Sequence, residues 1–331
     1  MKPIWKEILL AAFLGLVLPG LVVNFALSLE REDLPVAETP ETHAETEAPT
    51  QPLQMAALTM RLRQSDGSVT QMDMDEYLVG VILAELPASF EMEAKKAQSV
   101  AARTFALKAA VTGGKHGDGS VCASYACCQA YRTPEDYINS GGSVDAVNQA
   151  REAVLSTSGC VLTYEGNLIE ATYFSCSGGS TEDAVAVWGS DYPYLRAVSS
   201  PGEEHATHYT DTVYFTEGEL ESALGIYLTG SPEDWFGFTT YTAGGGVNTM
   251  RIGGRDFQGT ELRTMLGLRS TAFTVTPEGE GVSITTRGFG HRVGMSQYGA
   301  DAMAASGSGW EEILTYYYSG AELTLWEPAE N

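Results

Sequence analysis

The chain has 331 residues, of which 44% are hydrophobic, enough to bury the core of one large domain or two small ones. Its formal net charge is -24 at pH 7, from 43 acidic and 19 basic side chains. This acidity excludes nucleic acid as a partner, because phosphate backbones are bound by basic surfaces, and it opposes general adhesion to an anionic membrane.

The N-terminal segment predicts a membrane anchor. Lys2 and Lys6 precede residues 8–29, which carry no charged side chain and are long enough to cross a bilayer of about 30 Å. Because acidic residues follow the span, we expect a cytoplasmic N-terminus and an extracytoplasmic remainder. A cleaved signal peptide is the alternative, but the apolar run exceeds a usual signal core of about 7–15 residues. Residues 1–29 are therefore expected as the single-pass anchor of a cell-membrane protein.

Residues 30–54 predict a disordered stalk between this anchor and a folded domain. They are rich in Glu, Thr, Pro and Ala and contain almost no large apolar side chains. Such a segment cannot bury enough surface to offset the conformational entropy that folding removes. We expect the folded domain over residues 55–325.

Within that domain, helical patterns and hairpin signals are mixed without regular alternation, which predicts an α+β fold with antiparallel hairpins. Asp66-Gly67 predicts one hairpin, and residues 165–167 predict a second. A helical pattern over residues 136–155 is interrupted at its glycine pair. Further helices are expected over residues 217–224, 259–266, 295–305 and 310–317.

Two predicted helices flank one carboxylate. The first opens at Asp73 or Asp75, either of which can cap it, and stops just before Pro87. The second starts near Ser89. Glu85 then lies at a helix C-terminus among apolar neighbours, where the macrodipole and desolvation both disfavour its charged form. Such a carboxyl can keep a proton near neutral pH and suits a general acid, although a solvated surface glutamate is the other interpretation.

A cluster of one histidine and three cysteines predicts a metal site. His116, Cys122, Cys127 and Cys128 lie within thirteen residues and can form a closed tetrahedral zinc site of structural role. Disulfides are the alternative in an exported domain, but neighbouring cysteines rarely bond each other and the total of five is odd. Two cysteines outside this cluster are expected as buried thiols or as a lesser disulfide candidate, Cys160 and Cys176.

Three separated motifs resemble the stage II sporulation protein D family. They are AELP between the two helices with AQSVAARTFAL after it, YFSCSGGSTEDAVAVWGSDYPYLRAVSSP over residues 173–201, and GFGHRVGMSQYGADAMA over residues 288–304. The resemblance implies a lytic transglycosylase of peptidoglycan, with Glu85 at the position of the catalytic glutamate. Residues 203–246 match the family least well and are expected to be an insertion or a subdomain.

The implied reaction breaks the glycosidic bond after N-acetylmuramic acid without water. Glu85 protonates the leaving oxygen and, as the resulting base, takes a proton from the sugar's sixth-carbon hydroxyl, which closes an anhydro ring. By the same resemblance, the substrate is glycan stripped of stem peptides, and the partners are stage II sporulation proteins P and M. The implied setting is spore engulfment, at the mother-cell membrane that faces the forespore.

Other residues of the motifs are expected to contact the substrate. Arg103 and Gln98 belong to the second helix, and Tyr194 and Arg196 offer a ring and a cation for sugar stacking. The family usually has Lys at Arg196, and Gly where Arg292 stands. The remaining expected substrate contacts are Ser175, His291, Ser296 and Gln297.

Two other function classes compete with the transglycosylase hypothesis. A glycan-binding module that stimulates an amidase, as related amidase enhancers do, would bind denuded strands without cutting them. A zinc-dependent hydrolase would need an open metal position, which a four-ligand site does not leave.

Overall fold

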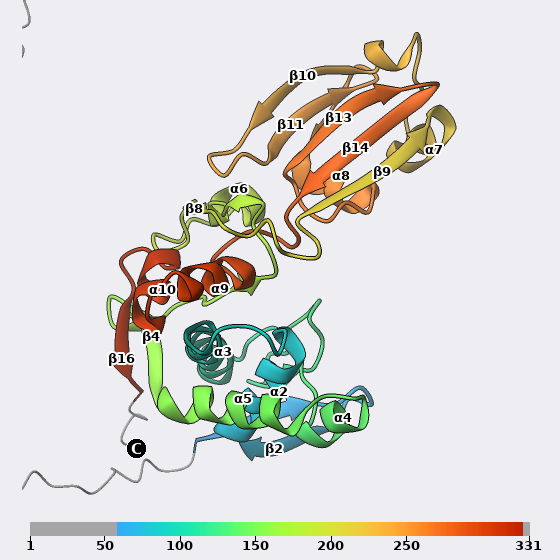
Figure 1. Ribbon diagram of the computed structural model, residues 1–331. Coiled ribbons are helices and arrows are strands. Elements are labelled where there is room, and N and C mark those ends of the chain that lie inside the picture. Colours follow the sequence, from blue (N-terminus) through green and yellow to red (C-terminus); the bar gives the residue numbers. More distant parts are fainter. Residues whose placement is uncertain (1–57, 327–331) are drawn as a thin grey trace, which may run out of the picture. The chain divides into compact units, whose positions relative to one another are not determined.

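The computed structural model describes residues 58–326 (Figure 1). The predicted anchor over residues 1–29 and the predicted stalk over residues 30–54 lie outside the described residues. Within residues 58–326, no helix combines the length and the apolar composition needed to cross a membrane. Helices there are mixed with small sheets of two or three strands, which confirms the predicted α+β class.

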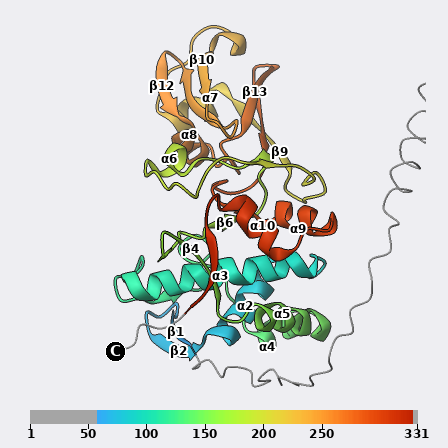
Figure 2. The ribbon, with the colours of Figure 1, turned by 90° about the vertical axis from the view of Figure 1, so that its left-hand side faces the viewer.

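The first of two hydrophobic cores surrounds the long helix α3 (Met92–Thr112). Small buried side chains on α3, such as Ala97 and Ala101, let neighbouring helices approach closely. Figures 1 and 2 show helices on two opposite sides of α3, and residue contacts join them to it. These helices are α2 (Met74–Glu85), α5 (Val144–Ser156), α9 (Gln297–Ala305) and α10 (Trp310–Tyr317), with α4 (Pro134–Asn139) packed on α2. Gly141-Gly142 separate α4 from α5, as predicted.

Local chemistry fixes both ends of α2. The Asp73 carboxylate caps the helix by accepting hydrogen bonds from the N–H groups of Asp75 and Glu76 at 2.9 and 3.1 Å. The helix ends at Glu85, and the next residue is extended, as a following Pro87 requires. The predicted position of Glu85 at the end of a helix is therefore confirmed.

The start of α3 differs from the prediction. The helix begins at Met92 rather than near Ser89. The carboxylate of Asp301, in α9, accepts the N–H of Glu91 at 2.7 Å. A contact from the far end of the chain thus holds the residue before the helix, and the local sequence contains no sign of it.

Short strands border the first core. Both predicted hairpins are present, one across Asp66-Gly67 and one across Glu165-Gly166. Strand β3 adds to β1 in parallel, and β16 pairs with β4 in antiparallel fashion, so distant segments complete these sheets. The strands are β1 (Thr59–Arg63), β2 (Val69–Asp73), β3 (Val121–Cys122), β4 (Cys160–Tyr164), β5 (Asn167–Leu168) and β16 (Glu322–Leu325).

A second core, coloured yellow to orange in Figure 1, lies between two antiparallel three-stranded sheets and two helices. It takes in strands well beyond the range 203–246 that the sequence marked as an insertion or subdomain. Its elements are β9 (Thr210–Thr216), α7 (Glu217–Leu224), η1 (Pro232–Asp234), β10 (Phe236–Tyr241), β11 (Val247–Ile252), β12 (Arg255–Gln258), α8 (Gly259–Met265), β13 (Phe273–Glu278) and β14 (Gly281–Arg287).

Loops and short elements from the second and third motifs connect the two cores. Strand β6 pairs with β15 in parallel, and β7 pairs with β8. These elements are β6 (Tyr173–Phe174), β7 (Gly179–Ser180), α6 (Ala184–Trp188), β8 (Ser199–Ser200) and β15 (Met295–Ser296).

A buried ion pair holds these loops together. Arg292 has a left-handed backbone, with φ of 65°, and its guanidinium lies 3.0 Å from the Glu182 carboxylate. The guanidinium also donates to the carbonyls of Ser177, Ser180 and a glycine in the loop over residues 242–246. That loop in turn donates to the Glu182 carboxylate. One residue pair thereby joins the second and third motifs to a loop next to the second core.

Replacing Arg292 by alanine should lower the free energy of unfolding by about 3–5 kcal/mol, because the Glu182 carboxylate stays buried without its cation. Chemical denaturation of the purified protein measures the loss. Arg255→Ala is the matched control: Arg255 is exposed and stacks on the Phe257 ring, so we expect a loss of about 1 kcal/mol or less. Equal losses in the two variants would contradict the role given to the buried pair.

Candidate functional site

One cleft of about 880 Å³ brings the end of α2 together with residues of the second and third motifs. Of the predicted catalytic and substrate-binding residues, Glu85, Ser175, His291 and Gln297 line it, and so do the predicted metal ligands Cys127 and Cys128. Cleft volumes of this size are typical of ligand sites. Segments far apart in the sequence therefore share one candidate site.

The Glu85 carboxyl group is half-buried and held at both oxygens. Oε1 accepts the N–H of Ala130 at 2.7 Å, and Oε2 accepts an Nε2–H of Gln297 at 3.2 Å. Burial raises the pKa of Glu85, and the two hydrogen bonds oppose the rise without cancelling it. A carboxyl with a raised pKa in a cleft can hold a proton and release it to a bound group, as general acid catalysis requires.

Gln129 fixes the loop that supplies the Ala130 N–H. Its Oε1 accepts the hydroxyl of Tyr77 at 2.8 Å, and its Nε2 donates to the hydroxyl of Tyr173 at 2.9 Å. Gln129 and Ala130 were missed in the sequence, because no local pattern shows that the loop after the cysteine pair returns to α2.

His291 forms part of the cleft wall between two aromatic rings. Its ring centroid lies 5.6 Å from that of Phe174 and 5.3 Å from that of Trp188. Burial, and next the charge of Arg263, lower the pKa of His291 to about 4, so the imidazole is neutral at physiological pH. Nδ1 accepts the N–H of Val293 at 3.1 Å, which leaves the proton on Nε2.

A second carboxylate, Glu170, also lines the cleft. It forms an ion pair with Lys108 at 3.1 Å. The N–H of Glu170 donates to the hydroxyl of Tyr194, which is only 7% exposed and lies outside the cleft lining. The prediction that Tyr194 contacts substrate is therefore wrong, and its neighbour Tyr192 lines the cleft instead.

The predicted substrate contact at Arg103 is also wrong, because the side chain is 0% exposed. Its guanidinium donates to the carbonyls of Val154 and Thr157 at the end of α5, and it lies 3.4 Å from the Asp75 carboxylate. Arg103 thus satisfies backbone acceptors where a helix ends, which is a role in folding.

Three further predicted contacts lie away from the cleft wall. Gln98 is 1% exposed within the first core, and Ser296 is 0% exposed and caps α9 by accepting the N–H of Gly299 at 3.2 Å. For these two, burial contradicts substrate contact. Arg196 pairs with Asp191 at 2.8 Å and does not line the cleft.

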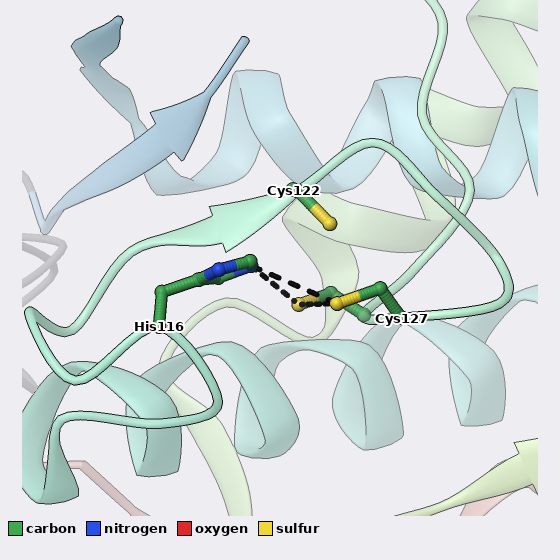
Figure 3. Close-up of side chains that lie close together, drawn as sticks. His116, Cys122 and Cys127 are labelled. Atoms are coloured by element: carbon green, nitrogen blue, oxygen red, sulfur yellow. Dashed lines mark hydrogen bonds between the residues drawn. The ribbon is translucent and has the colours of Figure 1, made fainter. Parts of the chain in front are cut away.

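The predicted metal ligands do come together. Figure 3 shows the side chains of His116, Cys122 and Cys127 pointing toward one another, and Cys128 completes the cluster. All four ligand atoms lie within 4.8 Å of one another. All five cysteines of the chain are free thiols in the structure, so neither disulfide alternative is formed.

The spacing of this cluster suits a tetrahedral metal ion. The sulfurs of Cys127 and Cys128 are 3.8 Å apart, and they lie 3.8 and 3.5 Å from Nε2 of His116. Zinc bonds to sulfur and nitrogen place such atoms about 3.6–3.8 Å apart. Burial raises the pKa of the Cys122 thiol, but hydrogen bonds from Ser124 and from the cluster outweigh it and bring the pKa to about 7. The cluster could therefore hold a metal ion, and four ligands leave it no open position.

Comparison with known proteins covers most of the chain. Residues 63–164 match the family described as Stage II sporulation protein. Stage II sporulation protein D of Bacillus subtilis (strain 168) is 38% identical over 266 residues, 79% of this chain and 77% of the relative. The protein of the same name from Bacillus amyloliquefaciens is 39% identical over 267 residues, with 79% and 77% covered. An amidase enhancer of Bacillus subtilis (strain 168) is 30% identical over 305 residues, 75% of this chain and 40% of the relative.

We expect the purified protein to bind one zinc ion per chain, and Cys127→Ser to lower the affinity for zinc by about 100-fold or more. Metal content by mass spectrometry and competition with a chromophoric chelator measure both quantities. Cys160→Ser is the matched control, because Cys160 lies outside the cluster. A protein that binds no zinc, or that joins two thiols of the cluster in a disulfide, would contradict the prediction.

Proposed function

Because the chain belongs to the stage II sporulation protein D family, we propose that it is a lytic transglycosylase of peptidoglycan with Glu85 as its catalytic acid and base. One observation carries the proposal: the Glu85 carboxyl, at the position implied by the family resemblance, lines a large cleft and has a raised pKa. A group of this kind is what protonation of a glycosidic oxygen requires.

In the proposed reaction, protonated Glu85 gives its proton to the glycosidic oxygen as the bond from that oxygen to the first carbon of N-acetylmuramic acid breaks. The Glu85 carboxylate then takes the proton of the sixth-carbon hydroxyl of the same sugar. The oxygen that loses this proton bonds to the first carbon and closes the 1,6-anhydro ring. One carboxyl group is regenerated in each turnover, and no water is consumed.

The partners of Glu85 suit both steps. The N–H of Ala130 and the amide of Gln297 stabilise the carboxylate that the first step creates. Burial favours the protonated form at the start of the next cycle. Burial and these hydrogen bonds thus act on the pKa of Glu85 in opposite directions, each favouring one of the two protonation states that the proposed reaction uses.

The proposed substrate is the glycan strand of peptidoglycan without stem peptides, and the proposed setting is spore engulfment. We further propose a membrane anchor in residues 1–29, an extracytoplasmic catalytic domain, and stage II sporulation proteins P and M as partners. The proposed zinc ion would stabilise the loop that carries Gln129 and Ala130, since Cys127 and Cys128 directly precede them.

A second candidate function is enhancement of an amidase through glycan binding. The 30% identity to a protein named amidase enhancer favours it. In this role the cleft would hold a strand without cutting it, so the chemistry of Glu85 would be irrelevant.

The first test identifies the product of the reaction. The protein incubated with denuded glycan strands should release 1,6-anhydro-N-acetylmuramic acid ends, detected by mass spectrometry. Glu85→Gln should lower the rate by about 10²–10⁴-fold, because an amide can neither donate nor accept the proton. An undiminished rate in this variant, or no anhydro ends from the wild type, would overturn the proposal; retained amidase stimulation by Glu85→Gln would then support the second function.

The second test is the stability of the same variant. Burial raises the pKa of Glu85 in the folded state, so its ionisation costs stability as pH rises above the ordinary value of 4.5. Glu85→Gln should therefore be more stable than the wild type near about pH 8, and the difference should vanish near about pH 4. Chemical denaturation at both pH values measures it, with the exposed Glu280→Gln as a control that shows no such pH-dependent gain. A pH-independent difference would contradict the assignment.

A further inference from the structure

Arg263, near the end of α8, lines the same cleft as Glu85. Its side chain is half-buried, and burial is what lowers its pKa. Within residues 58–326 its guanidinium has neither a hydrogen-bond acceptor nor an acidic partner. The buried arginines are different, since Arg103 and Arg292 each contact a carboxylate. A partly desolvated guanidinium without a partner is costly, and it is suited to an anion that enters from solution.

A second cation, Lys115, lines this cleft from the loop after α3. Its ammonium group donates to the carbonyl of Cys127. The positive charges of Arg263 and Lys115 both act on His291, where each lowers the pKa of the imidazole. The two cations share the cleft with two carboxylates that have partners of their own. Glu85 accepts two hydrogen bonds, and Glu170 is paired with Lys108. Arg263 has no carboxylate or carbonyl partner among the described residues, which indicates that the ligand brings a negative charge to it.

We infer that Arg263 binds the free lactyl carboxylate of an N-acetylmuramic acid residue and makes the cleft selective for strands without stem peptides. The inference rests on the proposed function. While a stem peptide is attached, the lactyl group is a neutral amide, which cannot form an ion pair. Hydrolysis of that amide exposes a carboxylate, and the planar fork of a guanidinium can hold both of its oxygens.

The same contact would distinguish the two states of the strand. While the amide bond between the lactyl group and the stem peptide is intact, the strand offers Arg263 no carboxylate. A neutral amide at the same place would leave the guanidinium desolvated and unpaired, and binding of uncleaved strands would be penalised.

The experiment measures binding rather than cleavage. The full-length chain carries Glu85→Gln, and the probes are glycan oligomers of one length, either with free lactyl carboxylates or with the same carboxylates converted to methyl amides. We expect the free-acid oligomer to bind about 10–100-fold more tightly than the amide. Adding Arg263→Gln should reduce this ratio to about one, and Arg263→Lys should keep part of it. Titration calorimetry gives the dissociation constants.

Arg255→Gln in the same Glu85→Gln background is the control for charge, because Arg255 is exposed and does not line the cleft. It should leave the ratio unchanged. A ratio that Arg263→Gln does not alter, or an equal loss of affinity for both oligomers, would overturn the inference. If the ratio depends on Arg263 but the wild type makes no anhydro ends, the cleavage proposal fails and the carboxylate site stands.

Discussion

The hydrogen bond from the Ala130 N–H to Glu85 Oε1 is the contact on which the cleft depends. It joins the end of α2, set by Pro87, to the loop that carries the His/Cys cluster. Gln297, at the start of α9, holds the other oxygen, so three distant segments meet at one carboxyl group. A proton held at this point is therefore controlled by packing across the whole first core rather than by the sequence around Glu85.

Much of the fold could be predicted where short-range chemistry decides it. The cap at Asp73, the stop before Pro87 and the turn at Asp66-Gly67 each follow from the residues themselves. The parallel pairs of β1 with β3 and of β6 with β15 could not be predicted, because they join segments through tertiary packing. The start of α3 was misplaced for the same reason, since a carboxylate from α9 determines it.

The residues of the candidate site also divide into those that the local sequence indicates and those that only tertiary packing reveals. The position of Glu85 at a helix end and the clustering of His116 with three cysteines could be predicted, because the stop before a proline and the spacing of such residues are visible in a sequence. Arg103 was predicted to contact substrate, but its guanidinium N–H groups donate to backbone carbonyls at the end of α5. Only the structure shows these hydrogen bonds. Arg263 was missed because it comes from the second core, outside every motif, and what distinguishes it is a lack of partners among the described residues, which a sequence does not display.

Strand β16 pairs with β4, and α9 and α10 pack on α3. The first core is therefore completed by elements from the C-terminal end of the described residues. A ribosome synthesises α3 and β4 long before these late elements exist. The elements of the second core are contiguous in the chain and can assemble first. The first core must wait with apolar surface uncovered until synthesis is nearly complete, so its folding is governed by long-range contacts and is slow. During that interval the uncovered apolar surface is available to a chaperone.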